Sequence, residues 1–192
     1  MILCGIDEAG RGCLAGPMAI AGAVLERSIE GLDDSKKLTR EKRAELFEII
    51  QKNAVFHIVL FSAGEIDEKG LSACLKAGLI EIKAAIKADR YLYDGNCSFG
   101  VSGVETRIKA DASVAQVAAA SILAKVSKDR ALLRLAENYP QYGFDRHQGY
   151  GVQAHLKAIA AFGLTPFHRK SFKRRNPKPI DLFAQNSLNY QI

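Results

Sequence analysis

The first twelve residues, MILCGIDEAGRG, restrict what this chain can fold into more than any other stretch. Apolar residues dominate positions 2–6, which predicts a buried strand, and Asp7 and Glu8 stand at its end. Carboxylates at the rim of a core are costly to keep ionised, so they need a basic partner, a proton or a metal cation. Glycines on both sides of Arg11 allow a sharp turn and a close approach of a ligand to the backbone. The stretch therefore predicts an acidic metal site beside a backbone surface that contacts a large ligand.

After this stretch the chain alternates between strand and helix patterns. Runs of apolar, β-branched or aromatic residues predict further strands over 18–25, 55–61, 91–93 and 106–110. Capping residues and helical spacing predict helices from a Thr39 cap to 53, from a Ser62-x-x-Glu65 capping box, from Gly70 to 86, from a Ser113 cap over 114–138, and over 153–162. An aromatic and basic loop is expected over 141–150. This order predicts an α/β fold, with a mixed β-sheet flanked by helices.

Acidic residues stand at three of the predicted strand ends. Asp94 follows the strand over 91–93 and Asp111 follows the strand over 106–110, as Asp7 and Glu8 follow the first. Strand ends on one edge of an α/β sheet are where ligands bind. Carboxylates that converge there without a basic partner repel one another, and divalent cations relieve this repulsion. Oxygen ligands favour Mg²⁺ or Mn²⁺ over zinc, and two such ions about 3.5–4 Å apart can hold a phosphodiester.

Each of these acids also has a simpler interpretation. Asp94 before Gly95 is typical of a turn, and Asp111 can assist the N-terminus of the following helix. Only their joint occurrence at strand ends favours the metal site. Adjacent strand residues point to opposite faces, so Asp7 and Glu8 both reach the metals only if the strand breaks at Glu8. Alternatively, Glu8 contributes its carbonyl oxygen.

A nucleotide-cofactor site is a competing interpretation of the same glycines. Gly10-x-Gly12-x-x-Ala15 matches the loose dinucleotide fingerprint, and Asp33-Asp34 lies near the distance expected for a ribose-binding acid. That fingerprint requires a helix directly after the glycines. Here two acids precede them, and a strand-like segment that contains Pro17 follows. We therefore reject a dinucleotide site.

Composition narrows the class of protein further. The net charge of +6 over 192 residues favours a polyanionic partner without requiring one. The four cysteines and four histidines lack the spacing of zinc ligands, so we expect free thiols in a reducing compartment. The chain reaches Asp7 too early for a signal peptide, and no apolar stretch is long enough to span a bilayer. We therefore expect a cytoplasmic protein with no membrane partner.

The motifs together resemble a known family. Asp7-Glu-Ala-Gly-Arg-Gly12, followed by Leu14-Ala-Gly-Pro17, is similar to the signature of the type 2 ribonucleases H, ribonuclease HII. Further matching motifs follow in the same order, namely Asp34-Ser35-Lys36, Asp94-Gly95, Lys109-Ala110-Asp111, 118–126, Asp129-Arg130, His147-x-Gly149-Tyr150 and 168–172. The resemblance implies an RNase H-like catalytic domain over 1–172, with a C-terminal tail or short helix over 173–192. We also expect a monomer.

The activity implied by the resemblance is endonucleolytic cleavage of RNA within an RNA–DNA hybrid. A DNA duplex that contains ribonucleotides is the second implied partner, with cleavage 5′ to a single ribonucleotide, as the first step of ribonucleotide removal. The products would carry a 3′-hydroxyl and a 5′-phosphate. The implied cofactors are two Mg²⁺ or Mn²⁺ ions, and the implied catalytic metal ligands are Asp7, Glu8, Asp94 and Asp111.

The resemblance also implies roles for residues around the acids. The backbone of Gly10, Arg11 and Gly12 would contact the 2′-hydroxyl, and Tyr150 would stack on the sugar of the following deoxynucleotide. The candidates for phosphate contacts and for support of the site are Lys36, Ser121, Lys125, Arg146 and Lys170. Two positions depart from the family pattern, because Lys128 replaces an arginine and Gln148 replaces a lysine.

Two other functions remain open at the level of the sequence. One is a different nuclease on the same acidic scaffold, and the other is a non-catalytic module that binds RNA–DNA hybrids. Asp94→Asn separates the enzyme from the module, since an enzyme should lose cleavage and keep binding. Beyond residue 172 no motif is matched, and we expect one short helix or frayed chain over 181–192.

Overall fold

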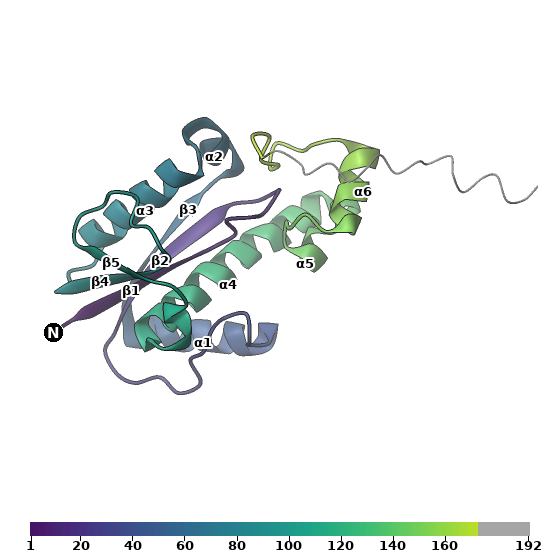
Figure 1. The fold of residues 1–192 in the computed structure, drawn as a ribbon. Coiled ribbons are helices and arrows are strands. Elements are labelled where there is room, and N and C mark those ends of the chain that lie inside the picture. Colours follow the sequence, from purple (N-terminus) through teal and green to yellow (C-terminus); the bar gives the residue numbers. More distant parts are fainter. Residues whose placement is uncertain (173–192) are drawn as a thin grey trace, which may run out of the picture.

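The computed structural model describes residues 1–172, and these form a five-stranded sheet with helices on both faces (Figure 1). The strands are β1 (Leu3–Ala9), β2 (Met18–Leu25), β3 (Ala54–Phe61), β4 (Arg90–Asp94) and β5 (Val104–Arg107). Their order in the sheet is β3-β2-β1-β4-β5. β1, β2 and β3 pair antiparallel, whereas β4 pairs parallel to β1 and β5 pairs parallel to β4. The mixed sheet predicted from the sequence is confirmed.

Six α-helices and two short 3₁₀ turns occur in the described residues. They are α1 (Arg40–Asn53), α2 (Ala63–Lys69), α3 (Leu71–Ala85), η1 (Ala110–Ala112), α4 (Ala115–Asn138), η2 (Pro140–Tyr142), α5 (Phe144–His147) and α6 (Gln153–Phe162). Two predicted caps are confirmed. The Thr39 side chain accepts a hydrogen bond from the Lys42 N–H, and Ser62 and Glu65 form a reciprocal capping box.

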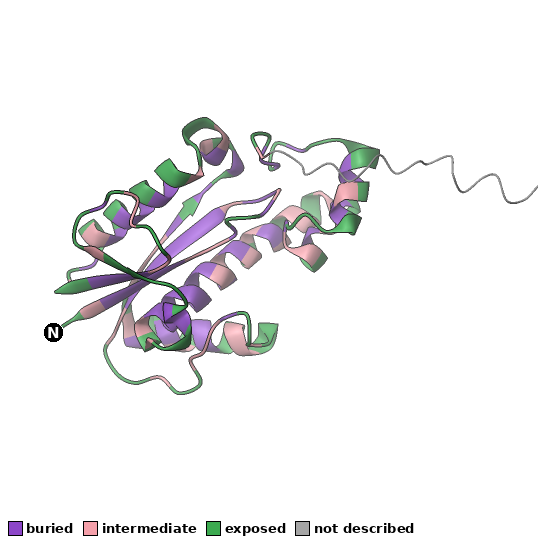
Figure 2. Ribbon diagram, viewed as in Figure 1, coloured by how far each residue is buried: buried purple, intermediate pink, exposed green. Residues whose placement is uncertain are grey.

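Buried residues occupy the central strands and parts of the helices beside them (Figure 2). Alternation along the strands divides these residues into a core on each face of the sheet. Cys4 and Ile6 of β1 pack with the apolar stripe of α3, which includes Leu79. On the other face, small residues of β2 such as Ala21 pack against α1 and α4. Both faces are covered, so the ends of the strands are left as the place where polar groups reach solvent.

The long helix α4 lies unusually close to β1. Gly5 faces it, and a Cβ added there would overlap the backbone of Gln116 and Val117. The small residues at 118–120 continue this close approach along β2. Because α4 lies so near the sheet, its next turns carry Ser121 to the end of β1.

Three details of the predicted fold are wrong around residues 104–115. The strand expected over 106–110 lies at 104–107, and Asp111 lies in η1 rather than at a strand end. Lys109 adopts a left-handed conformation, with φ of 59°, which turns the chain from β5 into η1. Ser113 does not cap α4, because its hydroxyl points back to the Ala110 carbonyl, 3.5 Å away, and Val114 occupies the N-cap. The N-terminus of α4 therefore has no side-chain cap and begins directly after the backbone turn of η1.

The segment after α4 forms a small subsidiary core at the far end of that helix. The expected loop over 141–150 contains η2 and α5, and Phe144 packs with Leu132 and Ile159. The chain then returns to the loop after β1 through isolated bridges between Cys13 and Tyr150 and between Ala15 and His168. Residues at opposite ends of the sequence are thereby joined.

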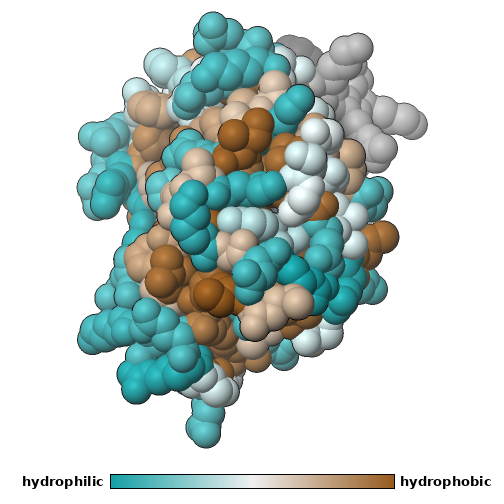
Figure 3. All heavy atoms as spheres, turned by 90° about the vertical axis from the view of Figure 1, so that its left-hand side faces the viewer, coloured by the Kyte–Doolittle hydropathy of each residue, from teal (hydrophilic) through white to brown (hydrophobic). Residues whose placement is uncertain are grey.

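The surface at the N-terminal end of the molecule mixes hydrophilic side chains with small separate apolar groups (Figure 3). Within residues 1–172, no helix is both long and apolar enough to cross a membrane. The helix expected over 181–192 lies outside the described residues.

Candidate active site

Asp7 and Asp94 lie side by side on neighbouring parallel strands. Ile6 is in register with Tyr93, so the acids that follow them stand together at the carboxyl ends of β1 and β4. Asp111 joins them from η1, and one carboxylate oxygen from each of the three acids lies within 4.8 Å of the other two. The Ala110 N–H donates to Asp94 Oδ1 at 3.2 Å, which ties η1 to the end of β4. The fold thus brings together three of the acids that the sequence singled out.

None of these three carboxylates forms an ion pair within 4 Å among the described residues, although the charge of Lys36 opposes the shift in the pKa of Asp111. Asp7 is 7% exposed and Asp111 is 4% exposed. Burial, with the charges of Glu8 and Asp94, raises the pKa of Asp7 well above its usual value. Burial, followed by the charges of Asp94 and Asp34, raises the pKa of Asp111 to about 6. A compact set of unpaired carboxylate oxygens is the donor set that suits a hard divalent cation.

Glu8 lies on the other side of the sheet. β1 continues through Glu8 to Ala9, so the strand does not break at Glu8, and the alternative in which Glu8 contributes its carbonyl oxygen stays a prediction. The Tyr93 hydroxyl donates to Glu8 Oε2 at 2.5 Å, and an Arg11 nitrogen lies 3.6 Å from Glu8 Oε1. Burial raises the pKa of Glu8, while these two partners oppose the shift. Glu8 is therefore outside the cluster of three acids, and its role as a metal ligand stays a prediction.

An open cleft of about 960 Å³ surrounds the acids. Besides the four acids, the predicted substrate-binding residues that line it are Gly10, Arg11, Gly12, Lys36, Ser121, Lys125 and Tyr150. Arg146 and Lys170 do not line it. The Arg146 side chain is 88% exposed, and the Lys170 backbone N–H donates to Asp67 at 2.8 Å. The phosphate contacts assigned to Arg146 and Lys170 stay predictions for an extended ligand that leaves the cleft.

The two glycines of the turn have different surroundings. Gly10 has φ of +88°, and an added Cβ would lie 2.9 Å from the Pro17 carbonyl oxygen and 3.2 Å from the Lys128 side chain. At Gly12 an added Cβ would meet nothing within 4 Å. Gly10 is therefore required by the fold, whereas Gly12 leaves its backbone open to the cleft.

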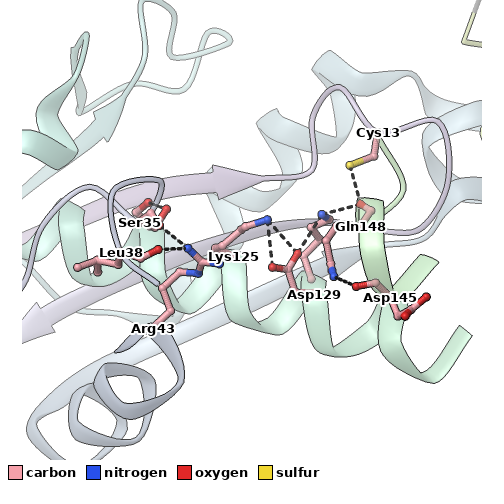
Figure 4. A network of polar contacts seen from close by, with 10 residues as sticks. Cys13, Ser35, Leu38, Arg43, Lys125, Asp129, Asp145 and Gln148 are labelled. Atoms are coloured by element: carbon pink, nitrogen blue, oxygen red, sulfur yellow. Dashed lines mark hydrogen bonds and ion pairs between the residues drawn. The ribbon is translucent and has the colours of Figure 1, made fainter. Parts of the chain in front are cut away.

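Lys128 is a site residue whose place the sequence did not reveal. It is fully buried, and its Nζ donates to Asp129 at 3.0 Å and to the Gln148 carbonyl at 2.8 Å. The same Nζ lies 4.7 Å from the centre of the Tyr150 ring. Lys125 donates to the same Asp129 carboxylate (Figure 4). The signal available in the sequence was spacing, since positions 121, 125 and 128 share one face of a helix.

A loop between β2 and α1 covers the other side of the acids. Ser35 and Ser121 share a hydrogen bond of 2.7 Å between their hydroxyls, and both residues are buried. Arg43 of α1 donates to the carbonyls of Ser35 and Leu38, which fixes the loop (Figure 4). The Ser121 side chain opposes the rise in the pKa of Asp7, so this loop and α4 lie against the first acid.

Comparison with known proteins is consistent with this geometry. The family model described as Ribonuclease HII matches residues 4–175. Ribonuclease HII of Sulfurovum sp. (strain NBC37-1) is 53% identical over 181 residues, which cover 94% of this chain and 96% of that protein. Ribonuclease HII of Campylobacter concisus (strain 13826) is 55% identical over 186 residues, with coverage of 97% and 98%. The solved PCNA:RNase HII complex from Archaeoglobus fulgidus contains a similar chain, with a TM-score of 0.78, 30% identity and coverage of 92% and 97%.

Proposed function

The chain belongs to the ribonuclease HII family of metal-dependent endoribonucleases, and we propose that it hydrolyses the RNA strand of RNA–DNA hybrids and cuts 5′ to single ribonucleotides embedded in duplex DNA. The observation that carries the proposal is the set of residues that line one cleft. Three unpaired carboxylates, the open backbone at Gly12 and the half-exposed ring of Tyr150 all face the same space. One bound strand could therefore contact both the hydrolytic carboxylates and the groups that recognise the sugar.

The acids account for the hydrolysis. Divalent cations held by Asp7, Asp94 and Asp111 would neutralise the scissile phosphodiester and activate the attacking water, as a pair of ions about 3.5–4 Å apart does in other nucleases. Either Mg²⁺ or Mn²⁺ suits these oxygen ligands. Ser121 interacts with Asp7, and the Ala110 N–H orients Asp94. The products are a 3′-hydroxyl and a 5′-phosphate.

The turn and Tyr150 account for the choice of sugar. The Gly10–Gly12 backbone contacts the 2′-hydroxyl, the group that distinguishes RNA from DNA. Tyr150 stacks on the sugar of the next deoxynucleotide, and the ammonium groups of Lys125 and Lys128 beneath its ring hold it in place. Lys36, which lines the cleft near Asp111, contacts the backbone phosphates.

Cleavage of a DNA duplex that carries one ribonucleotide tests the proposal. With Mg²⁺ or Mn²⁺ we expect a single cut on the 5′ side of the ribonucleotide, and with EDTA we expect none. Asp94→Asn should abolish the cut and retain binding of the duplex. An all-DNA duplex cut as fast as the ribonucleotide-containing one would reject the proposed recognition of the 2′-hydroxyl.

A further inference from the structure

A short C-terminal segment lies against the loop that follows β1. The Gly16 N–H donates to the Phe167 carbonyl at 2.9 Å, and the Arg169 N–H donates to the Leu14 carbonyl at 2.8 Å. On its other side, the Leu14 N–H donates to the Gly149 carbonyl at 2.8 Å. The loop after β1 is thus held between the segment 165–169 and the residue that precedes Tyr150.

Two buried histidines connect this segment to Tyr150. The Thr165 N–H donates to His168 Nδ1 at 2.9 Å, so the proton of the His168 ring is on Nε2. His168 Nε2 lies 3.1 Å from His155 Nε2 and donates to it, which places the proton of His155 on Nδ1. That Nδ1–H donates to the Tyr150 carbonyl at 2.9 Å. The hydrogen bonds form one directed chain from the segment to Tyr150.

A third histidine holds the other side of the Tyr150 backbone. The His147 ring stacks on His155 with their centres 4.3 Å apart, and the Gly149 N–H donates to its Nδ1 at 3.2 Å. The Tyr150 N–H donates to the His147 carbonyl at 3.0 Å. The hydrogen bonds of the three rings fit one tautomer for each of them. They hold the Tyr150 backbone at both its N–H and its carbonyl.

Arg169, the next residue after His168, holds the glycine turn. Its side chain is 3% exposed, although it carries a charge. It donates to the Arg11 carbonyl at 3.1 Å and, through two further N–H groups, to the Gly16 carbonyl at 3.1 and 3.2 Å. His168 and Arg169 are adjacent in the chain. Through their contacts, His168 is connected to Tyr150 and Arg169 to the Gly10–Gly12 turn.

We propose that His155, His168 and Arg169 are positioning residues that fix the distance between the Gly10–Gly12 turn and Tyr150, and so set the preference for a single ribonucleotide. This inference rests on the proposed function, in which the turn and Tyr150 contact adjacent sugars. A continuous RNA strand offers a 2′-hydroxyl at every step, so the turn alone can engage it. A single ribonucleotide requires both contacts at once, and it is therefore the substrate that depends on their separation.

Two substitutions of the same histidine test the chain of hydrogen bonds. His155→Asn places an amide N–H where His155 Nδ1 stands, so the bond to the Tyr150 carbonyl is kept. His155→Gln places its amide at the Nε2 position and loses that bond. We expect His155→Gln to reduce kcat/KM about tenfold more on the single-ribonucleotide duplex than on a continuous hybrid, because small displacements of a positioned group are costly. His155→Asn keeps the bond to the Tyr150 carbonyl and loses only the bond from His168, so it should lower the ratio of these two kcat/KM values less than His155→Gln does.

His57→Gln is the matched control. His57 lies on β3, is paired with Glu81 and takes no part in the chain of histidines. It should leave the ratio of the two kcat/KM values unchanged. If His155→Gln does not yield folded protein, Arg169→Lys replaces it, since a lysine keeps the charge and cannot hold both carbonyls. Arg169→Lys is likewise expected to reduce kcat/KM more on the single-ribonucleotide duplex than on the continuous hybrid.

A measurement on the wild-type enzyme tests the chain without any substitution. Nitrogen-15 NMR of the imidazoles should show the Nε2–H tautomer for His168 and His147 and the Nδ1–H tautomer for His155. An Nε2–H tautomer at His155 would overturn the proposal. Equal losses of kcat/KM on both substrates in His155→Gln would also overturn it, because these describe a purely structural role.

Tyr150→Ala on the same two substrates separates this inference from the proposed function. Suppose that Tyr150→Ala lowers kcat/KM more on the single-ribonucleotide duplex than on the continuous hybrid while His155→Gln lowers both equally. In that case the positioning role is rejected and the role of Tyr150 stands. If Tyr150→Ala lowers kcat/KM equally on both substrates, the role of Tyr150 and the positioning role are both rejected, and the hydrolysis of RNA–DNA hybrids stands.

Discussion

Gly10 and Gly12 are two residues apart in the turn, and the structure predicts opposite consequences for the same substitution. Gly10→Ala places a Cβ against the Pro17 carbonyl and Lys128 in a left-handed conformation, so we expect a loss of about 1–3 kcal/mol of unfolding free energy. Gly12→Ala meets no atom within 4 Å and should leave stability unchanged. Its methyl group enters the cleft, so cleavage next to a ribonucleotide should fall at least tenfold. Urea denaturation and single-turnover cleavage measure the two effects, and full activity in Gly12→Ala would contradict the role of this backbone.

Asp7 illustrates the conflict between stability and function at a single carboxylate. Its pKa is raised by burial and by nearby acids, so its ionisation opposes folding. We expect Asp7→Asn to abolish turnover and, in EDTA at pH 7–8, to raise Tm by about 2–4 °C for each kcal/mol of repulsion removed. The gain should shrink as the pH falls, because Asp7 then becomes protonated in the wild type.

The effect of metal provides the control for Asp7→Asn. Adding Mg²⁺ or Mn²⁺ should raise the Tm of the wild type and should have a smaller effect on the variant, which lacks one ligand charge. A variant that melts below the wild type in EDTA would contradict the electrostatic explanation.

At the scale of elements, the contact between β1 and α4 determines where the acids meet. Gly5→Ala forces a methyl group into the backbone of α4, so we expect a loss of 1–3 kcal/mol or more, on the order seen for overpacked cores. Activity should fall as well, because α4 carries Ser121 and Lys125. Gly64→Ala in α2 is the control, since it meets nothing within 4 Å and should gain about 0.5–1 kcal/mol from helix propensity. Chemical denaturation in EDTA compares the two, and unchanged stability in Gly5→Ala would contradict the close packing.

The histidine cluster between α5, α6 and the C-terminal segment predicts a dependence of stability on pH. Burial lowers the pKa of His155, and the ionisable groups that face it are His147 and His168. The unfolded chain therefore binds more protons than the folded one below pH 6.5, the ordinary value for histidine. The unfolding free energy should be fully retained above that pH and should fall by up to about 1.4 kcal/mol per pH unit below it.

The comparison with His155→Asn isolates this contribution. Acids such as Asp7 shift the pH dependence of both proteins in the opposite direction, so their effect cancels in the difference between the two. The difference in unfolding free energy should narrow from pH 7 to pH 5. A constant difference across that range would show that His155 has the same proton affinity in the folded and unfolded chains.

For the whole molecule, the number of phosphate contacts determines how binding depends on salt. Lys36 lines the cleft, and its replacement by alanine should reduce the slope of log K against log[salt] by about 0.9. Lys170→Ala should do the same only if duplex DNA extends from the cleft past α2, where Asp67 holds the Lys170 backbone. Lys76→Ala on the exposed side of α3 is the control and should leave the slope unchanged. An unchanged slope for Lys170→Ala would remove it from the phosphate contacts.

The molecule also shows which parts of the site were predictable. Asp7 and Asp94 were predicted to meet because acids at the carboxyl ends of adjacent parallel strands share an edge, and β1 and β4 are such a pair. The orientation of Glu8 followed from strand alternation alone, and the strand did not break to change it. Asp111 was expected at a strand end. Instead, it lies in η1, which follows the left-handed Lys109, and it reaches Asp7 and Asp94 from that turn. Sequence patterns report backbone periodicity well and report irregular turns poorly.

The sequence by itself determined the local chemistry of this protein, namely the acidic strand end, the glycine turn, the caps of α1 and α2, and the family to which the chain belongs. These features depend on residues close together in the chain, so their spacing specifies them. Only the tertiary structure decided that Lys128 is buried beneath Tyr150 and that His168 reaches Tyr150 through His155. These contacts join distant parts of the chain, and their geometry exists only once the sheet, α4 and the C-terminal segment have packed together.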